Sequence, residues 1–189
     1  FKMNNQNYLS GNIICATPQL RGGFFSKSII YITHHDINGA AGIVLNYKLT
    51  DINRSEVFKR LDIQNLNYKN DFSIHLGGPM NQTLGFILHS KEYKSSDTMK
   101  ITDYVNLTCS RKIMEDIAKN IGPSKFFISL GYSGWGPGQL ENEFKENSWL
   151  HLSEKLDLIF DIDSEQKWDR AIKSTGIDFS KFSNVTGHA

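Results

Sequence analysis

The first half of the chain is a series of short apolar runs separated by glycine, proline and asparagine. Runs of this length that are rich in β-branched residues are typical of strands. We therefore expect strands at 12–16, 28–33, 42–45, 72–76 and 85–89, and a further one at 125–130. Some runs are apolar at consecutive positions, which indicates strands covered on both faces: Ile29-Ile30, Ile43-Val44-Leu45 and Phe86-Ile87-Leu88. The sheet is expected to be sandwiched or curled.

Four other segments have the spacing of short helices, at 54–61, 110–121, 139–147 and 164–176. In the second segment Ile113, Ile117 and Ile121 recur at four-residue steps, which predicts one buried face. Strands and helices do not alternate regularly, so a doubly wound parallel sheet is not expected. We expect a mixed α/β fold of the α+β type, with residues 1–189 in a single domain and about four short helices beside the sheet.

Positive and negative charges are almost balanced along the chain. The sequence has 21 Lys and Arg residues against 20 Asp and Glu residues, which gives a formal net charge of +1. A protein without a positive global field lacks the main source of non-specific affinity for nucleic acid. The basic residues Lys91, Lys94 and Lys100 alternate with acidic ones, as solvated surfaces normally do. Nucleic acid is therefore not an expected partner.

The cysteines and the longest apolar stretches narrow the class of protein further. Cys15 and Cys109 form neither a CxxC pair nor a zinc-ligand spacing, so no disulfide framework, structural zinc or cofactor is expected. Apolar stretches such as Phe126 to Leu130 are far shorter than the roughly 20 residues that span a bilayer, and we expect no contact with a membrane. The polar segment 1–6 lacks the apolar core of a secretory signal, so a cytoplasmic location is expected.

The most informative segment runs from Leu130 to Glu141 and reads LGYSGWGPGQLE. A strand that passes through a glycine-rich turn into a helix presents backbone N–H groups, which can hold a phosphate or carboxylate. The glycines match neither a P-loop nor a GxGxxG pattern. The alternative is a tight turn that needs positive φ and lets Trp135 pack closely. Ser133 is not expected to be a nucleophile, because Trp135 stands where a nucleophile elbow requires glycine.

A second glycine bend and several histidines complete the candidate groups. Residues 77–79 follow a predicted strand, and their two glycines either let the backbone approach a ligand or make a plain turn. His35 and His89 end two predicted strands, and with His188 they would supply three metal ligands. Their spacing matches no zinc motif, and hydrogen bonds to nearby backbone are the competing interpretation.

Several longer motifs follow one another in a distinctive order. They are Ala16-Thr17-Pro18-Gln19-Leu20 with Phe25-Ser26-Lys27-Ser28, His35 with Gly39 to Asn46, Gly77-Gly78-Pro79 with Gly85 to His89, Leu130-Gly131-Tyr132 with Gly138 to Glu141, Trp149, and Gly187-His188-Ala189. Together they resemble the AlgH/YqgE family of bacterial proteins over nearly the whole chain. The resemblance implies a complex α/β domain whose branched sheet folds into a pseudo-barrel.

The resemblance implies less about function. The family's link with transcription comes from effects on exopolysaccharide production attributed to its AlgH branch, and no helix-turn-helix signature stands out in this sequence. Three positions depart from the family pattern. Residues 21–23 stand where members commonly place an aspartate, Ser133 where relatives often have alanine, and Thr33 where some have cysteine. No acidic, nucleophilic or redox role at these positions is therefore implied.

Three functions are compatible with the sequence. The favoured one is a regulatory module, without demonstrated catalysis, in which the two glycine bends lie together and leave a hollow for a small anionic molecule. The residues expected to line this hollow are Gly77, Gly78, Pro79, His89, Tyr132, Trp135, Gly136, Gly138 and Gln139. The alternatives are a transcriptional regulator that binds DNA directly and a metal-dependent enzyme that uses His35, His89 and His188. The sequence predicts no oligomeric state.

Overall fold

The computed structural model describes residues 8–64, 68–69, 71–177 and 179, and nine strands in these residues form one sheet. The strand order is β6-β7-β5-β8-β3-β2-β1-β9, and β4 pairs with β8 outside this path. The strands are β1 Ile13–Ala16, β2 Ile29–Asp36, β3 Gly39–Val44, β4 Ile74–Leu76, β5 Met80–Ser90, β6 Thr98–Lys100, β7 Val105–Thr108, β8 Phe126–Trp135 and β9 Trp149–Leu152. The helices are α1 Arg54–Arg60, α2 Arg111–Ala118, α3 Gln139–Lys145, the π-helix η1 Asp157–Asp161 and α4 Ser164–Ser174.

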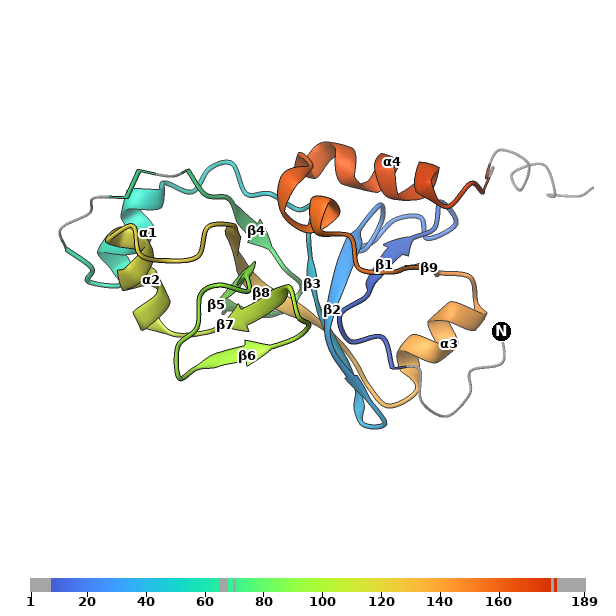
Figure 1. Ribbon diagram of the computed structural model, residues 1–189. Helices are drawn as coiled ribbons and strands as arrows, with labels where there is room; N and C mark the ends of the chain where they lie inside the picture. Colours follow the sequence, from blue (N-terminus) through green and yellow to red (C-terminus); the bar gives the residue numbers. More distant parts are fainter. Residues whose placement is uncertain (1–7, 65–67, 70, 178, 180–189) are drawn as a thin grey trace, which may run out of the picture.

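The sheet branches at β8. Residues 128–130 of this strand pair in parallel with β4, while residues 126–130 pair antiparallel with β5. Beyond Gly131, residues 133–135 pair with β3 instead. Gly131 has a φ of +71°, a left-handed conformation that is accessible to glycine because it has no Cβ. The bend at Gly131 thus lets one strand belong to both halves of the sheet, which diverge in Figure 1.

Successive residues of β2 contribute to different apolar clusters. Ile29 and Tyr31 belong to the cluster packed against η1 and α4, whereas Ile30 and Ile32 belong to the cluster packed against α3. A further cluster lies against α1 and α2 in the other half of the molecule (Figure 1). Burial on both faces explains the consecutive apolar residues of the sequence. The expected mixed α/β fold with a branched, curled sheet is confirmed.

The glycine-rich segment after Leu130 is strand, where a turn was expected. The strand expected at 125–130 continues to Trp135, and its last residues are held by the pairs Ala40–Trp135 and Gly42–Ser133 in the ladder with β3. The turn before α3 is confined to residues 136–138. The expectation was wrong because glycine-rich segments occur both at bends within strands and in turns, so amino-acid composition does not distinguish the two.

Other differences concern short elements. Strands β6, β7 and β9 and the π-helix η1 are absent from the expected set, so the described residues contain five short helices rather than four. Helix α2 ends at Ala118, and Asn120 with a φ of +60° redirects the chain, so that Ile121 is 63% exposed instead of buried. In the part of the chain that the structure describes, no helix is long and apolar enough to cross a membrane.

Candidate functional site

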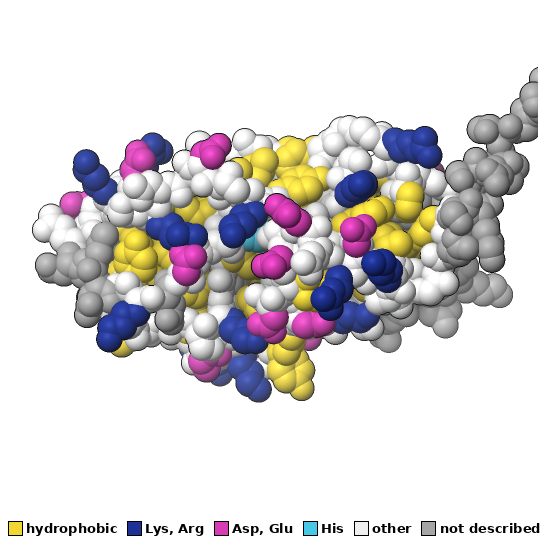
Figure 2. All heavy atoms as spheres, turned by 90° about the horizontal axis from the view of Figure 1, so that it is seen from above, with side chains coloured by type: hydrophobic (Ala, Val, Ile, Leu, Met, Phe, Trp, Pro, Cys, Tyr) yellow, Lys and Arg dark blue, Asp and Glu magenta, His cyan; other side chains and the backbone are white. Residues whose placement is uncertain are grey.

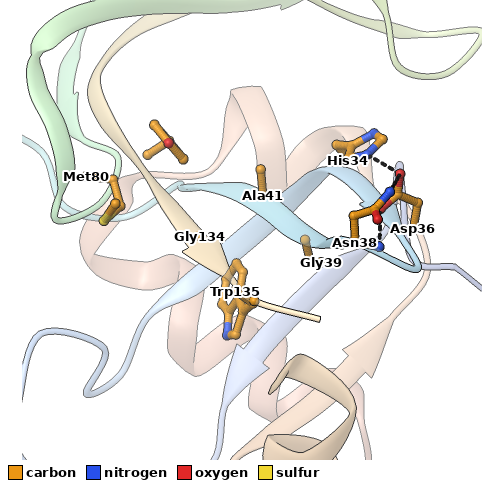
Figure 3. A pocket seen from close by; sticks show the side chains of 11 residues that line it. His34, Asp36, Asn38, Gly39, Ala41, Met80, Gly134 and Trp135 are labelled. Carbon is orange, nitrogen blue, oxygen red and sulfur yellow. Dashed lines mark hydrogen bonds and ion pairs between the residues drawn. The ribbon is translucent and has the colours of Figure 1, made fainter. Parts of the chain in front are cut away.

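An open hollow of about 470 Å³ lies over the sheet where β3 and β8 run side by side (Figure 3). Three parts of the chain form its walls: the β2–β3 hairpin, the start of β5 and the end of β8. The lining residues are His34, Asp36, Asn38, Gly39, Ala40, Ala41, Met80, Tyr132, Gly134, Trp135 and Gly136. The branched sheet therefore assembles this hollow from segments that are distant in the sequence.

Small residues form the floor of the hollow. In the ladder between β3 and β8, Ala41 lies opposite Gly134, so the middle of this surface carries only a methyl group and a hydrogen. A Cβ added to Gly134 would lie 3.5 Å from the Tyr132 ring and 3.9 Å from Met80 Cγ, which are ordinary contact distances. The strand geometry would accept a side chain at position 134, and its absence in glycine leaves the floor of the hollow open.

One end of the hollow carries a negative charge. Asp36 Oδ1 accepts a hydrogen bond from the Asn38 backbone N–H at 2.7 Å, and Oδ2 accepts one from Asn38 Nδ2 at 3.3 Å. His34 Nε2 lies 3.2 Å from Asp36 Oδ2. The Asn38 N–H, more than any other group, lowers the pKa of Asp36 below its ordinary value. The hairpin therefore holds an ionised carboxylate at the edge of the hollow.

The other end is apolar, and Figure 3 places Met80 across the floor from His34 and Asp36. Met80 is 47% exposed although it is a large apolar residue. The half-buried Tyr132 packs its ring edge-on against Phe86, with 5.8 Å between the ring centres. A flexible methionine beside an aromatic ring makes an apolar surface that adapts to different shapes. The hollow thus combines a carboxylate at one end with an apolar wall at the other.

The two glycine bends meet, but their main chains are in direct contact. A Cβ added to Gly78 would lie 2.0 Å from the Tyr132 carbonyl carbon. The Gly77 N–H donates to the Leu130 carbonyl oxygen at 2.9 Å. Gly77, Gly78 and Pro79 therefore hold the branch of the sheet together and do not line the hollow. Of the second bend, Tyr132, Trp135 and Gly136 do line it.

The backbone N–H group of Gly136, near the place where an anion was expected, already donates a hydrogen bond within the chain. The Gly136 N–H donates to Gln139 Oε1 at 3.0 Å, and Gln139 Nε2 donates to Glu143 Oε1 at 2.9 Å. Glu143 Oε2 also accepts hydrogen bonds from Trp135 Nε1 at 2.8 Å and Trp149 Nε1 at 2.7 Å. Glu143 was not predicted from the sequence, where its only signal is the helical spacing of four residues from Gln139.

Like Gln139, two other expected residues, Gly138 and His89, lie outside the lining of the hollow. Gly138 has a φ of +72° and precedes α3 as its N-cap. His89 is fully buried in β5, where Nδ1 bonds the Ser90 carbonyl oxygen at 2.9 Å and Nε2 bonds Thr108 Oγ1 at 2.8 Å. Burial lowers the pKa of His89, which keeps the ring neutral. Both residues therefore have structural roles in the described chain.

The described histidines of the metal alternative, His35 and His89, do not form part of a common metal site. His35 is buried, its Nδ1 accepts a hydrogen bond from the Leu9 N–H at 3.0 Å, and its Nε2 lies 3.0 Å from Glu141 Oε1. His188 lies outside the described residues. Across those that are described, no three His, Cys, Asp or Glu side chains are placed to share a metal ion. His35 and His89 each serve a local hydrogen-bond network instead.

Comparison with known proteins connects this fold with one family. A family model described as AlgH-like matches residues 13–180. The chain belongs to the AlgH-like family. A UPF0301 protein from Shewanella denitrificans is 38% identical over 181 residues, which cover 95% of this chain and 98% of that protein. A UPF0301 protein from Nitrobacter hamburgensis is 39% identical over 197 residues, which cover 98% and 89% of the two chains.

Solved structures show the same AlgH-like fold. The solution structure of the AlgH protein from Pseudomonas aeruginosa superposes with a TM-score of 0.78 at 30% identity and covers 100% of both chains. A crystal structure of a protein from Corynebacterium diphtheriae has a TM-score of 0.71 at 17% identity, covering 91% of this chain and 90% of that one, and supports the fold alone. The family predicted from the sequence motifs is therefore confirmed.

Proposed function

We propose that this AlgH-like protein is a regulatory module that binds a small neutral or positively charged organic molecule in the hollow over Ala41 and Gly134. The observation that carries the proposal is the empty floor between an ionised carboxylate and an exposed apolar wall. Concave, partly apolar sites with a few polar groups are the usual form of ligand pockets. The volume of about 470 Å³ lies within the range of roughly 300–1,000 Å³ that such pockets have.

The polarity of the site favours a cation or a neutral donor over an anion. The Asp36 carboxylate would repel a negative group, and the Gly136 N–H already donates to Gln139. A ligand with an ammonium or amide N–H group would bond Asp36 at one end. A flat or apolar part of the same ligand would cover Met80 and Tyr132 at the other end.

The lining favours binding over catalysis. Its side chains offer a carboxylate, an imidazole, an amide and apolar contacts, without a serine, cysteine or lysine nucleophile among the residues that line it. The side chains of His34 and Asp36 are 59% and 38% exposed, so proton transfer there would not be confined to a bound substrate. A ligand bound here would join the β2–β3 hairpin to the start of β5, and this link supports the proposed regulatory role.

Direct binding to DNA is not part of the proposal. On the face shown in Figure 2, basic and acidic side chains are intermixed instead of forming a basic stripe. The formal net charge of +1 adds no long-range attraction to a polyanion. We include a cytoplasmic location in the proposal, because Cys15 and Cys109 are both free thiols, as expected in a reducing compartment.

The test fills the hollow and asks whether binding is lost. Gly134→Val places a side chain on the floor. Gly85→Val is the matched control because Gly85 also lies in a strand and nothing lies within 4 Å of its missing Cβ. Small amines, amides and nucleosides are screened by thermal shift against the wild type, and hits are titrated by calorimetry. We expect Gly134→Val to weaken binding by about tenfold or more and Gly85→Val to leave it within about twofold.

A second variant tests the polarity of the ligand. Asp36→Asn removes the negative charge and keeps a side chain of the same shape, so it should weaken binding of an amine hit about tenfold. Neutral hits should change little. The proposal is contradicted when no compound stabilises the wild type, or when the hits bind Gly134→Val as tightly as Gly85→Val.

A further inference from the structure

A second hollow, of about 130 Å³, lies where η1 and the start of α4 pack over β4 and the first residues of β8. It shares no lining residue with the hollow described above. Its wall includes Ser73, His75, Phe127 and Lys167. His75 and Lys167 are each only 2% exposed, although both side chains are ionisable. Buried ionisable groups beside a hollow are candidates for a functional site.

Lys167 is buried without an acidic partner. Its Nζ donates to the Ile159 carbonyl oxygen of the π-helix at 2.8 Å and lies 5.9 Å from the centre of the Phe127 ring. No ion pair of the described residues includes Lys167, and Asp161 pairs with Lys125 instead. Burial lowers the pKa of Lys167 to about 8, although Asp161 and Asp163 act in the opposite direction. Burying an unpaired charge costs free energy, and for this reason lysines are almost never fully buried unless they are paired.

His75 lies against the same aromatic ring as Lys167. The His75 and Phe127 rings are stacked with 4.5 Å between their centres, and His75 Nε2 lies 2.8 Å from Ser73 Oγ. His75 Nδ1 is buried and makes no hydrogen bond of ordinary geometry. Burial, followed by the charges of Lys167 and Lys48, lowers the pKa of His75 to about 3, while the Leu45 backbone partly offsets this. The imidazole is therefore neutral, and its Nδ1 makes no regular hydrogen bond although the Leu45 backbone lies close to the ring.

We propose that Lys167 is a nucleophilic lysine that forms an imine with a small aldehyde or ketone held in this second hollow. The geometry that supports the proposal is a buried amine without a carboxylate partner, a neighbouring unpartnered imidazole nitrogen and a hollow that both residues line. Lysines in desolvated surroundings are the ones that proteins use for imine chemistry. The competing role is purely structural, in which Nζ only satisfies the Ile159 carbonyl oxygen.

The step balances without an oxidant or reductant. The lone pair of the neutral Nζ adds to the carbonyl carbon, a C–N bond forms and the C=O π electrons move to oxygen. His75 Nδ1 relays one N–H proton from nitrogen to that oxygen, which gives a carbinolamine and leaves the imidazole neutral again. The nitrogen lone pair then expels the hydroxyl group, which takes the second N–H proton and leaves as water, so amine and carbonyl give imine and water. The charged groups around the reacting nitrogen are Lys48, Asp161 and Asp163.

The size of the hollow limits the ligand to short carbonyl compounds. A hollow of about 130 Å³ has room for only a few water molecules. Acetaldehyde and pyruvate are of this size, whereas pyridoxal phosphate is too large. Lys48 also lines the hollow and supplies a positive charge for the carboxylate of an oxo acid such as pyruvate.

The test traps the imine in the full-length protein. Acetaldehyde or pyruvate is added at about pH 7 with sodium cyanoborohydride, which reduces an imine to a stable secondary amine, and the adducts are located by peptide mass mapping. We expect Lys167 to be labelled at least about tenfold faster than the exposed Lys59 and Lys145, because about a tenth of its amine is neutral at this pH. Pyridoxal phosphate should label Lys59 and Lys145 and spare Lys167.

Two variants separate the proposed chemistry from a structural role. Lys167→Arg keeps the charge but cannot form an imine, so its adduct should disappear. His75→Phe preserves stacking on Phe127 and should slow labelling of Lys167 without changing that of Lys145. Equal labelling rates of Lys167 and Lys145 in the wild type would overturn the proposal, even if a variant failed to fold. Gly134→Val should leave the labelling unchanged, which separates this site from the first hollow.

Discussion

Glu143 gives two residues of the glycine-rich motif, Trp135 and Gln139, a structural role. Its carboxylate accepts hydrogen bonds from the indole groups of Trp135 and Trp149 and from the side chain of Gln139. Each indole has one N–H donor, and a buried donor without a partner costs roughly 1–3 kcal/mol. The tryptophans therefore depend on one helical residue for their orientation. Trp135 also lines the first hollow, so this network fixes one of its walls.

Removing this carboxylate should destabilise the protein. Glu143→Ala leaves two indole N–H groups without their acceptor, and we expect a loss of about 3 kcal/mol in the free energy of unfolding. Glu146→Ala, at the exposed end of the same helix, should change it by less than about 0.5 kcal/mol. Urea denaturation followed by tryptophan fluorescence measures both values. Equal stabilities of the two variants would show that the network is unimportant.

At the level of strands, the branch at β8 brings two main-chain segments closer together than a side chain between them would allow. The Gly77–Gly78 segment packs directly on residues 129–133 of β8. Residues at such a crossing are restricted to glycine by the space around the missing Cβ. The same branch brings β3 beside the end of β8 and so creates the floor of the first hollow.

A methyl group at the branch should therefore be poorly tolerated. Gly78→Ala places a Cβ 2.0 Å from the Tyr132 carbonyl carbon. The backbone has to move to relieve this clash. We expect a loss of more than about 3 kcal/mol of stability or failure to fold. Gly85→Ala, where nothing lies within 4 Å of the added Cβ, should stay within about 1 kcal/mol of the wild type. Thermal unfolding of both variants tests the branch, and similar melting temperatures would contradict it.

The sequence predicts local elements of this fold better than it predicts their junctions. Burial of residues 29–32 on both faces of the sheet follows from the apolar pattern, and so does the buried face of α2. The continuation of β8 past Gly131 does not, because only pairing with β3 makes this segment a strand. The motif after Leu130 predicts that Tyr132, Trp135 and Gly136 line a site. Asp36 and Met80 are not predicted, because only strand pairing between distant parts of the chain brings them to the same hollow.

At the scale of the whole molecule, buried histidines make stability depend on pH. The pKa of His75 is about 3 in the folded protein, against an ordinary value of 6.5. Between these two values the unfolded chain binds more protons than the folded one, so stability falls as the pH is lowered from 6.5. The buried His89 and the more exposed His151 have lowered pKa values as well, and they contribute in the same direction.

His75→Phe should reduce this acid sensitivity. The variant removes the largest of these contributions, so the loss of stability between about pH 6.5 and pH 4 should shrink by roughly 2–3 kcal/mol. The remaining histidines keep part of the slope. Urea denaturation of wild type and variant at several pH values measures the difference. Parallel pH profiles would mean that His75 is protonated normally in the folded state.

The proposed function requires that ligands bind in the hollow between the β2–β3 hairpin and the end of β8. Binding there can be located by mapping backbone amide NMR shifts during titration with a compound that passes the thermal-shift screen. We predict that the amides of Asn38, Ala41, Gly134 and Trp135 respond together and that the response disappears in Gly134→Val. Shifts confined to other parts of the chain, with these four amides unchanged, would contradict the account.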